Sequence, residues 1–300
     1  MGTPAFAVPP LEALLNSHHN IIAVVTAPDK PAGRGRKISH SPVKEFALKN
    51  ELNLLQPLKL KDPSFIESLK LLNADLQVVV AFRLLPEPIW NMPPLGTFNL
   101  HASLLPQYRG AAPINHAIIN GETETGLTTF FLDNQVDTGN IIMQEKVRIE
   151  ENDNAGTLHD KLMSKGAQLV VKTVDMIHAG NCKTLPQKNI PVKIENLRTA
   201  PKIKKQDCLI NWLKNGTDIV NHIRGLSPSP SAFSFLHDGE TKISVKLYEA
   251  VFIPSVSASP PGTIDSDNKK FMNVTVKDGY ISIKSLQLEG KNKMNIAQFL

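Results

Sequence analysis

The sequence predicts an α/β protein with a Rossmann-like, mostly parallel sheet, followed by a smaller β-rich domain. Helical and strand-like patterns alternate over residues 1–180, which is typical of βα units that build a parallel sheet. A stretch rich in Pro and Lys then interrupts the pattern, and short strand-like segments fill the rest of the chain. The length of 300 residues fits two ordinary domains.

The strands expected in the first domain are short, apolar and rich in β-branched residues, as befits strands buried on both faces. The predicted strands are 21–26, 52–56, 76–82, 98–101, 125–132 and 139–149. Helical periodicity fills the intervals, and Pro42 and Pro63 stand in the first turn of their helices, where proline is favoured. The predicted helices are 9–17, 41–50, 62–72, 114–120 and 154–179.

Residues 181–205 read as an extended basic linker, because they hold three prolines and seven Lys or Arg against a single acid, Glu195. The short strand-like segments of residues 206–300 predict a small β-barrel, in which Asp278-Gly279 forms a hairpin turn. Its expected elements are a helix at 217–224 and strands at 232–236, 242–252, 262–264, 272–276 and 280–285. We therefore expect a domain at 1–180, a linker at 181–205 and a second domain at 206–300.

Charge is divided unevenly along the chain, whose net charge is +5. Residues 1–180 carry 16 Lys or Arg against 18 Asp or Glu, whereas residues 181–300 carry 17 against 10. A basic second part favours a polyanionic partner, with a merely solvated basic surface as the alternative.

Composition also excludes several classes of protein. Two isolated cysteines, Cys182 and Cys208, make neither a disulfide framework nor a zinc site. No apolar run approaches the roughly 18 residues that span a bilayer, and no signal peptide opens the chain. No Gly-x-Gly-x-x-Gly follows a strand, and the glycines at 33 and 35 lack the Lys-Ser/Thr of a phosphate-binding loop. We expect a soluble cytoplasmic protein that does not bind a membrane.

Three polar residues suggest chemistry. Asn99 and His101 alternate with apolar residues, so both point to one side of a strand that ends at His101. Asp137 lies in a turn-rich loop that can return its carboxylate to this strand end. An amide can stabilise an oxyanion, and an imidazole beside a carboxylate can move protons. The alternative is a core histidine and a turn aspartate.

A basic loop precedes the second helix. It carries Lys30, Arg34, Arg36 and Lys37 around two glycines. Arginine pairs well with phosphate, and glycine allows close approach of the backbone, so the loop suits the end of an RNA arm. A solvated loop is the alternative.

Several motifs, in order, resemble the formyltetrahydrofolate-dependent formyltransferases. They are Asn-Leu-His at 99–101, Ser-Leu-Leu-Pro at 103–106, Tyr-Arg-Gly-Ala-Ala-Pro at 108–113 and Val-Asp-Thr-Gly at 136–139. Gly-Thr-Pro at 2–4 and Pro-Ala-Gly-Arg-Gly-Arg-Lys at 31–37 are similar to those members that formylate initiator methionyl-tRNA. The resemblance covers nearly the whole chain. It departs from the family pattern in three places: no apolar strand precedes Gly2, the chain stops abruptly at Leu300, and Val-Ala-Phe-Arg at 80–83 replaces the more usual Ala-Tyr-Gly.

The resemblance implies roles for these residues. Asn99, His101 and Asp137 are then the catalytic residues, and 10-formyltetrahydrofolate is the formyl donor, with no metal. The folate-binding turn is Ser103, Leu104, Leu105 and Pro106. The acceptor is initiator methionyl-tRNA, contacted by Lys30, Arg34, Arg36 and Lys37 and by an OB-like second domain. We expect the protein to be a monomer.

Three alternatives remain open at the level of the sequence. The first 180 residues fit a formyltransferase for a small amine or a sugar nucleotide equally well. A formyltetrahydrofolate hydrolase, in which water replaces the amine, needs the same polar residues. A non-catalytic RNA-binding protein on a degenerate folate fold is a third possibility, which the intact Asn, His and Asp disfavour.

Overall fold

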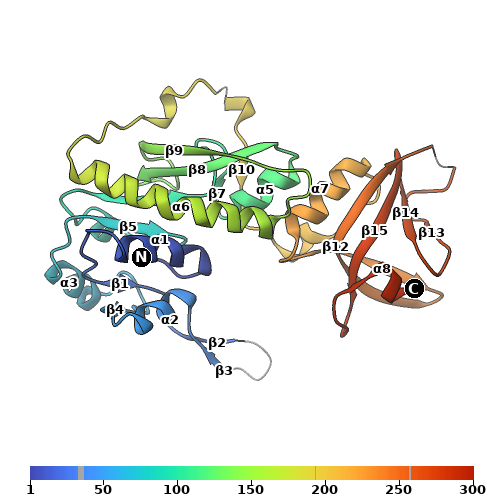
Figure 1. Cartoon of the computed structure of the whole chain (residues 1–300), viewed down its shortest axis with the longest axis horizontal. Helices are drawn as coiled ribbons and strands as arrows, with labels where there is room; N and C mark the ends of the chain where they lie inside the picture. The colour runs from blue at the N-terminus through green and yellow to red at the C-terminus, as the bar shows by residue number, and fades with distance from the viewer. Residues whose placement is uncertain (33–36, 193, 257) are drawn as a thin grey trace. The chain divides into compact units, whose positions relative to one another are not determined.

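The computed structural model describes residues 1–32, 37–192, 194–256 and 258–300, and these form two compact units (Figure 1). The first unit comprises Met1–Arg109, Gly126–Val147 and His159–Arg198. The second comprises Gly110–Thr125, Arg148–Leu158 and Thr199–Leu300. Each unit thus draws on separate stretches of the chain. The ranges expected for two domains and a linker stay a prediction.

The first unit contains parallel strand pairs, as predicted. Strand β1 (Val24–Val25) pairs in parallel with β4 (Leu54–Leu55), and β5 (Gln77–Val80) pairs in parallel with β6 (Thr97–His101). Beyond β6 the sheet changes direction, because the next strand, β8 (Glu124–Phe131), runs antiparallel to it. Strand β9 (Ile141–Arg148) completes the order β5-β6-β8-β9. The predicted α/β class is confirmed.

The helices begin where the sequence places proline and capping residues. Helix α2 starts after Ser41, whose Oγ accepts from the Lys44 N–H, and α3 starts after Asp62, whose carboxylate accepts from the Ser64 N–H. The helices up to residue 180 are α1 (Val8–Leu15), α2 (Pro42–Lys49), α3 (Pro63–Leu71), α4 (Glu87–Trp90), α5 (Pro113–Ile119) and α6 (Ala155–His178). Within the described ranges, no helix has the length and apolarity needed to cross a membrane.

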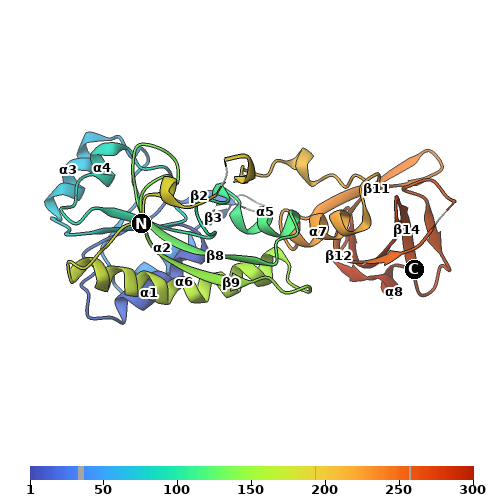
Figure 2. The ribbon, with the colours of Figure 1, turned by 90° about the horizontal axis from the view of Figure 1, so that it is seen from above.

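Helix α6 covers one face of the sheet, where it runs along β8 and β9 (Figures 1 and 2). Leu100 of β6 points toward this helix, since a side chain at Gly166 would meet it at 2.8 Å. The hydroxyls of Thr129 and Thr173 also meet between β8 and α6, 3.0 Å apart. Because side chains alternate along a strand, Asn99 and His101 face the opposite side of the sheet.

Met1 and Gly2 lie between β1 and β5. The Gly2 N–H donates to the Val25 carbonyl at 3.0 Å, and the Val80 N–H donates to the Met1 carbonyl at 2.9 Å. The α-amino group of Met1 is buried and donates to the Val78 carbonyl at 2.7 Å, and burial lowers its pKa to about 5. A cavity of about 460 Å³ borders these residues.

The second unit is built on an antiparallel sheet around its own core, which agrees with the expected barrel-like class. Its elements are α7 (Gly216–Leu226), β11 (Ala232–Asp238), β12 (Thr241–Pro254), β13 (Ile264–Ser266), β14 (Met272–Val276), β15 (Gly279–Leu288), β16 (Met294–Asn295) and α8 (Ile296–Phe299). The strand order is β11-β12-β15-β14-β13, and β16 pairs with β15. A register shift near Glu249 lets the long strand β12 bend over the core. Leu226, Ile281 and Leu286 are fully buried there.

His222 on α7 makes the stability of the second unit depend on pH. Burial lowers its pKa, a nearby Lys214 lowers it further, and a hydrogen bond with the Cys208 backbone opposes both. Its Nε2 is buried with no partner among the described residues. The unfolded chain therefore binds this proton more readily, so we expect stability to fall as the pH drops below about 6.5. When the pH is lowered from 8 to 5, the melting temperature of His222→Gln should fall less than that of wild type. His237→Gln, at an exposed site, should show the same fall as wild type.

Candidate active site

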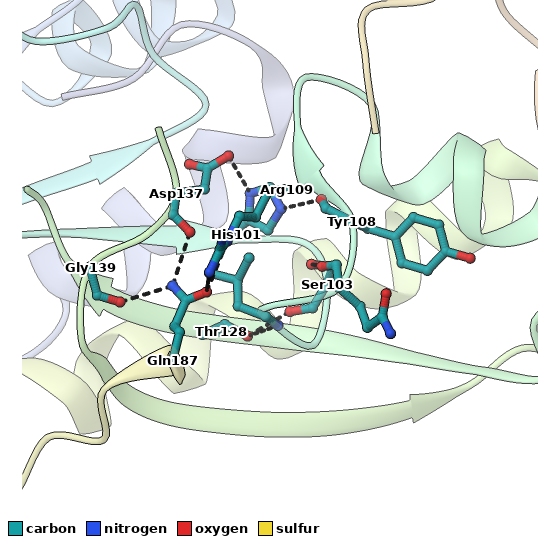
Figure 3. Close-up of polar contacts among 10 residues, drawn as sticks. His101, Ser103, Tyr108, Arg109, Thr128, Asp137, Gly139 and Gln187 are labelled. Atoms are coloured by element: carbon teal, nitrogen blue, oxygen red, sulfur yellow. Dashed lines mark hydrogen bonds and ion pairs between the residues drawn. The ribbon is translucent and has the colours of Figure 1, made fainter. Parts of the chain in front are cut away.

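His101 lies between a carbonyl and a carboxylate at the end of β6 (Figure 3). Its Nε2 is 2.9 Å from the Tyr108 carbonyl oxygen, and its Nδ1 is 3.9 Å from Asp137 Oδ2. A carbonyl can only accept, so Nε2 carries a proton and donates it. This fixes the tautomer and leaves Nδ1 as the ring atom that can gain or lose a proton. The separation of 3.9 Å is too long for a direct hydrogen bond.

Asn99 lies two residues before His101 on the same side of β6. Its side chain is partly exposed and has no hydrogen-bond partner among the described residues. Phe130 stands opposite Asn99 on β8. Its ring packs edge-to-face against the His101 ring, with the ring centroids 6.5 Å apart. An amide donor thus stands beside the imidazole, free to face a substrate oxygen.

The backbone at Asp137 and Tyr108 is left-handed, with φ of 57° and 59°. Asp tolerates this conformation, whereas it is uncommon for a bulky residue such as Tyr. Tyr108 is held by its N–H, which donates to the Arg198 carbonyl at 2.7 Å. This conformation presents the Tyr108 carbonyl to His101.

Gln187 braces the loop that carries Asp137 (Figure 3). Its Nε2 donates to the carbonyls of Asp137 and Gly139, each at 2.9 Å. Its Oε1 accepts from Arg109 Nε at 3.0 Å and Nη2 at 2.6 Å. Gln187 is only 5% exposed and lies within the segment that the sequence marks as a linker. Sequence reasoning missed it, because no local pattern signals a contact across about 50 residues.

Loss of the Gln187 brace is expected to lower activity more than stability. Gln187→Leu leaves Arg109 and two carbonyls without their partner, which should cost about 1–3 kcal/mol of unfolding free energy. A loosened Asp137 should lower kcat by about tenfold to 100-fold. Gln187→Glu keeps an acceptor for Arg109 but cannot donate to both carbonyls, so it should lose kcat to a similar extent. Recovery of the wild-type kcat in Gln187→Glu would contradict the bracing role.

The turn expected to bind folate is tied to the sheet by its own hydrogen bonds. Ser103 Oγ donates to the Gln107 carbonyl at 2.6 Å, and Thr128 Oγ1 donates to the Ser103 carbonyl at 2.6 Å. The Leu105 N–H donates to Thr128 Oγ1 at 3.1 Å. Ser103, Leu105 and Pro106 are buried, and Leu104 is partly exposed. Their contact with folate stays a prediction.

The basic loop is flanked by two paired strands. Strand β2 (Lys30–Ala32) runs antiparallel to β3 (Lys37–Ser39), and Lys30 is exposed. Arg34 and Arg36 lie outside the described residues. Next to the hairpin, Asp29 accepts from Lys44 at 2.5 Å, and this hydrogen bond is the main cause that lowers the Asp29 pKa. A role in tRNA binding stays a prediction.

Both parts of the chain match known protein families. Residues 1–174 match the family described as formyl transferase, and residues 202–300 match the family described as formyl transferase, C-terminal domain. The chain belongs to the formyl transferase family. The family predicted from the motifs is confirmed.

Curated relatives resemble this formyl transferase along its whole length. The methionyl-tRNA formyltransferase of Bacteroides fragilis is 53% identical over 301 residues, which cover 100% of this chain and 93% of the relative. That of Flavobacterium johnsoniae is 51% identical over 300 residues, which cover 100% and 94%.

Solved structures share the fold of this formyl transferase. The sugar 3N-formyltransferase WlaRD, solved with dTDP and 5-N-formyl-THF, superposes with a TM-score of 0.69 at 23% identity and covers 97% of both chains. HypX from Aquifex aeolicus, solved with tetrahydrofolic acid, has a TM-score of 0.60 at 18% identity and covers 85% of this chain and 43% of its own.

Proposed function

We propose that this protein transfers the formyl group of 10-formyltetrahydrofolate to the α-amino group of initiator methionyl-tRNA. The observation that carries the proposal is identity above 50% with methionyl-tRNA formyltransferases over the whole chain, both units included. The likeness to sugar formyltransferases lies at 22–23% identity and supports the fold alone. The product, formylmethionyl-tRNA, serves translation initiation.

The first step is attack by the amine on the formyl carbon. The amine must be neutral, and α-amino groups titrate near about 8. A bond forms between the amine nitrogen and the formyl carbon, and the formyl oxygen becomes an oxyanion. The Asn99 amide donates a hydrogen bond to this oxygen, and a protonated Nδ1 of His101 adds a second donor. One such donor typically contributes about 100- to 1,000-fold in rate.

The second step moves protons and breaks the bond to the folate. Asp137 accepts the proton of the attacking amine through a water molecule. His101 then gives the proton on Nδ1 to the folate nitrogen as the carbon–nitrogen bond breaks. The proton held by Asp137 then passes through a water molecule to Nδ1, which restores the site. The Tyr108 carbonyl keeps Nε2 protonated throughout.

The acceptor is bound through its phosphates. Lys30 on the hairpin is exposed, and the second part of the chain carries an excess of basic residues. Lys30, Arg34, Arg36, Lys37 and the second unit are our candidates for contacts to the tRNA backbone. Transfer to tRNA should therefore weaken as the salt concentration rises, because each neutralised phosphate releases counterions.

A panel of acceptors tests the proposal. The protein is incubated with 10-formyltetrahydrofolate labelled in the formyl group, together with charged initiator tRNA, uncharged tRNA, free methionine or an amino sugar nucleotide. Transfer to the charged tRNA alone is the expected result. Transfer to the sugar nucleotide, or loss of the formyl group to water without transfer, would overturn it.

A further inference from the structure

Two histidines and an aspartate that formyl transfer does not use lie together in the first unit. His18 and His19 follow helix α1, and Asp175 lies in the last turn of α6. The Nε2 of His19 is 2.8 Å from Asp175 Oδ1, and the Nε2 of His18 is 3.6 Å from the same oxygen. One ligand atom from each residue lies within 4.8 Å of the other two.

The distances and the chemistry of this cluster fit a zinc ion. Tetrahedral Zn²⁺ with bonds of about 2.0–2.2 Å separates its ligand atoms by about 3.3–3.5 Å. The two His–Asp separations of 2.8 and 3.6 Å lie on either side of this value, and the two imidazole nitrogens lie within 4.8 Å of each other, so small side-chain rotations create the site. Two imidazoles and a carboxylate are a typical zinc ligand set, whereas Mg²⁺ and Ca²⁺ prefer oxygen alone.

The surroundings of the cluster are arranged for a cation. The C-terminal end of α6, a helix of 24 residues, carries a partial negative charge. The rings of His18 and His19 already lie side by side, with centroids 4.1 Å apart. The loop is held by Ser17, whose Oγ accepts from the His19 N–H at 3.2 Å and donates to the Leu14 carbonyl at 2.7 Å. The His18 side chain is 71% exposed, which gives an ion a path of entry and leaves a position for water.

We propose that His18, His19 and Asp175 bind one Zn²⁺ ion. The ion joins the loop after α1 to the last turn of α6, two segments about 156 residues apart, and so stabilises the first unit. Without metal, the hydrogen bond between His19 and Asp175 holds the pair together. None of the three residues belongs to the candidate site of formyl transfer, so the proposal does not depend on the proposed function.

Metal titration of the full-length, tag-free protein tests the site. Co²⁺ should give the visible absorption of a tetrahedral complex, and Zn²⁺ should displace it with one equivalent per chain. His18→Ala and Asp175→Asn should each weaken Zn²⁺ binding by at least about 100-fold, because each removes a ligand. His159→Gln is the matched control, since His159 lies 3.0 Å from Asp160 but belongs to no group of three ligands among the described residues. This control should bind like wild type.

Thermal unfolding gives a second measurement. Zn²⁺ should raise the melting temperature of wild type and of His159→Gln, because it binds the folded state alone, and should not raise that of His18→Ala. His18 is exposed, so its replacement leaves the fold intact and the comparison meaningful. Equal Zn²⁺ affinity in wild type and His18→Ala, or a Co²⁺ spectrum identical to that of the free ion, would overturn the proposal.

Discussion

Asp137→Asn is expected to lower kcat/KM for formyl transfer by about 100- to 10,000-fold, the range for a lost proton acceptor. Asparagine has the same shape and tolerates the left-handed backbone at φ 57°. The backbone carbonyl at this position keeps its hydrogen bond from Gln187. The amide cannot accept the amine proton, so the chemical step should fail while folding stays normal. Steady-state kinetics with charged tRNA, together with a melting curve, make the comparison.

Asp133→Asn is the matched control for this experiment. Asp133 lies in the same loop, and its replacement removes the same charge, but in the described part of the chain its Oδ1 serves to accept hydrogen bonds from the Gln135 N–H and the Thr138 hydroxyl. An amide oxygen can keep both contacts, so its kcat/KM should stay within a few-fold of wild type. Equal losses in the two variants would mean that loop charge, and not the position of Asp137, matters.

Gly139→Ala is expected to destabilise the protein and to inactivate it. A side chain at this position would lie 1.7 Å from the Phe131 carbonyl oxygen, so two backbone segments must move apart. Overpacking of this kind costs about 3 kcal/mol or more of unfolding free energy. The same movement shifts Asp137, and a misplacement of about 1 Å should lower kcat/KM by about 100-fold.

Gly180→Ala provides the comparison for Gly139→Ala in urea unfolding and kinetics. Gly180 has open space around it, with φ of 67°, so alanine there should cost only about 1–2 kcal/mol through its left-handed backbone. Activity should be unchanged. A Gly139→Ala protein with the stability and rate of wild type would contradict the close approach at Phe131.

Much of the first unit follows from local patterns. The capped helices after Ser41 and Asp62 and the apolar strand β5 are visible in the sequence, because periodicity and capping act over a few residues. The hairpin of β2 and β3 was not predicted, since proline, glycine and lysine dominate that stretch. The antiparallel direction of β8 beside β6 was not predicted either, because the direction of a strand in a sheet depends on contacts far along the chain.

The candidate site, too, could be predicted from the sequence only in part. The placement of Asn99 and His101 on one side of a strand follows from alternation, and the return of Asp137 follows from its turn-rich loop. The partner of His101 does not, because it is a backbone carbonyl presented by the unusual conformation of Tyr108. The role of Gln187 could not be predicted from the sequence either, since it rests on hydrogen bonds to residues about 50 positions away.

The central claim, that formyl transfer takes place at His101, is tested most directly by single-turnover kinetics. Wild type and His101→Ala are loaded with 10-formyltetrahydrofolate and mixed with charged initiator tRNA, and formylmethionyl-tRNA is measured over time. We expect His101→Ala to slow the chemical step by about 100- to 10,000-fold while it still binds the folate. A rate within a few-fold of wild type would contradict the account.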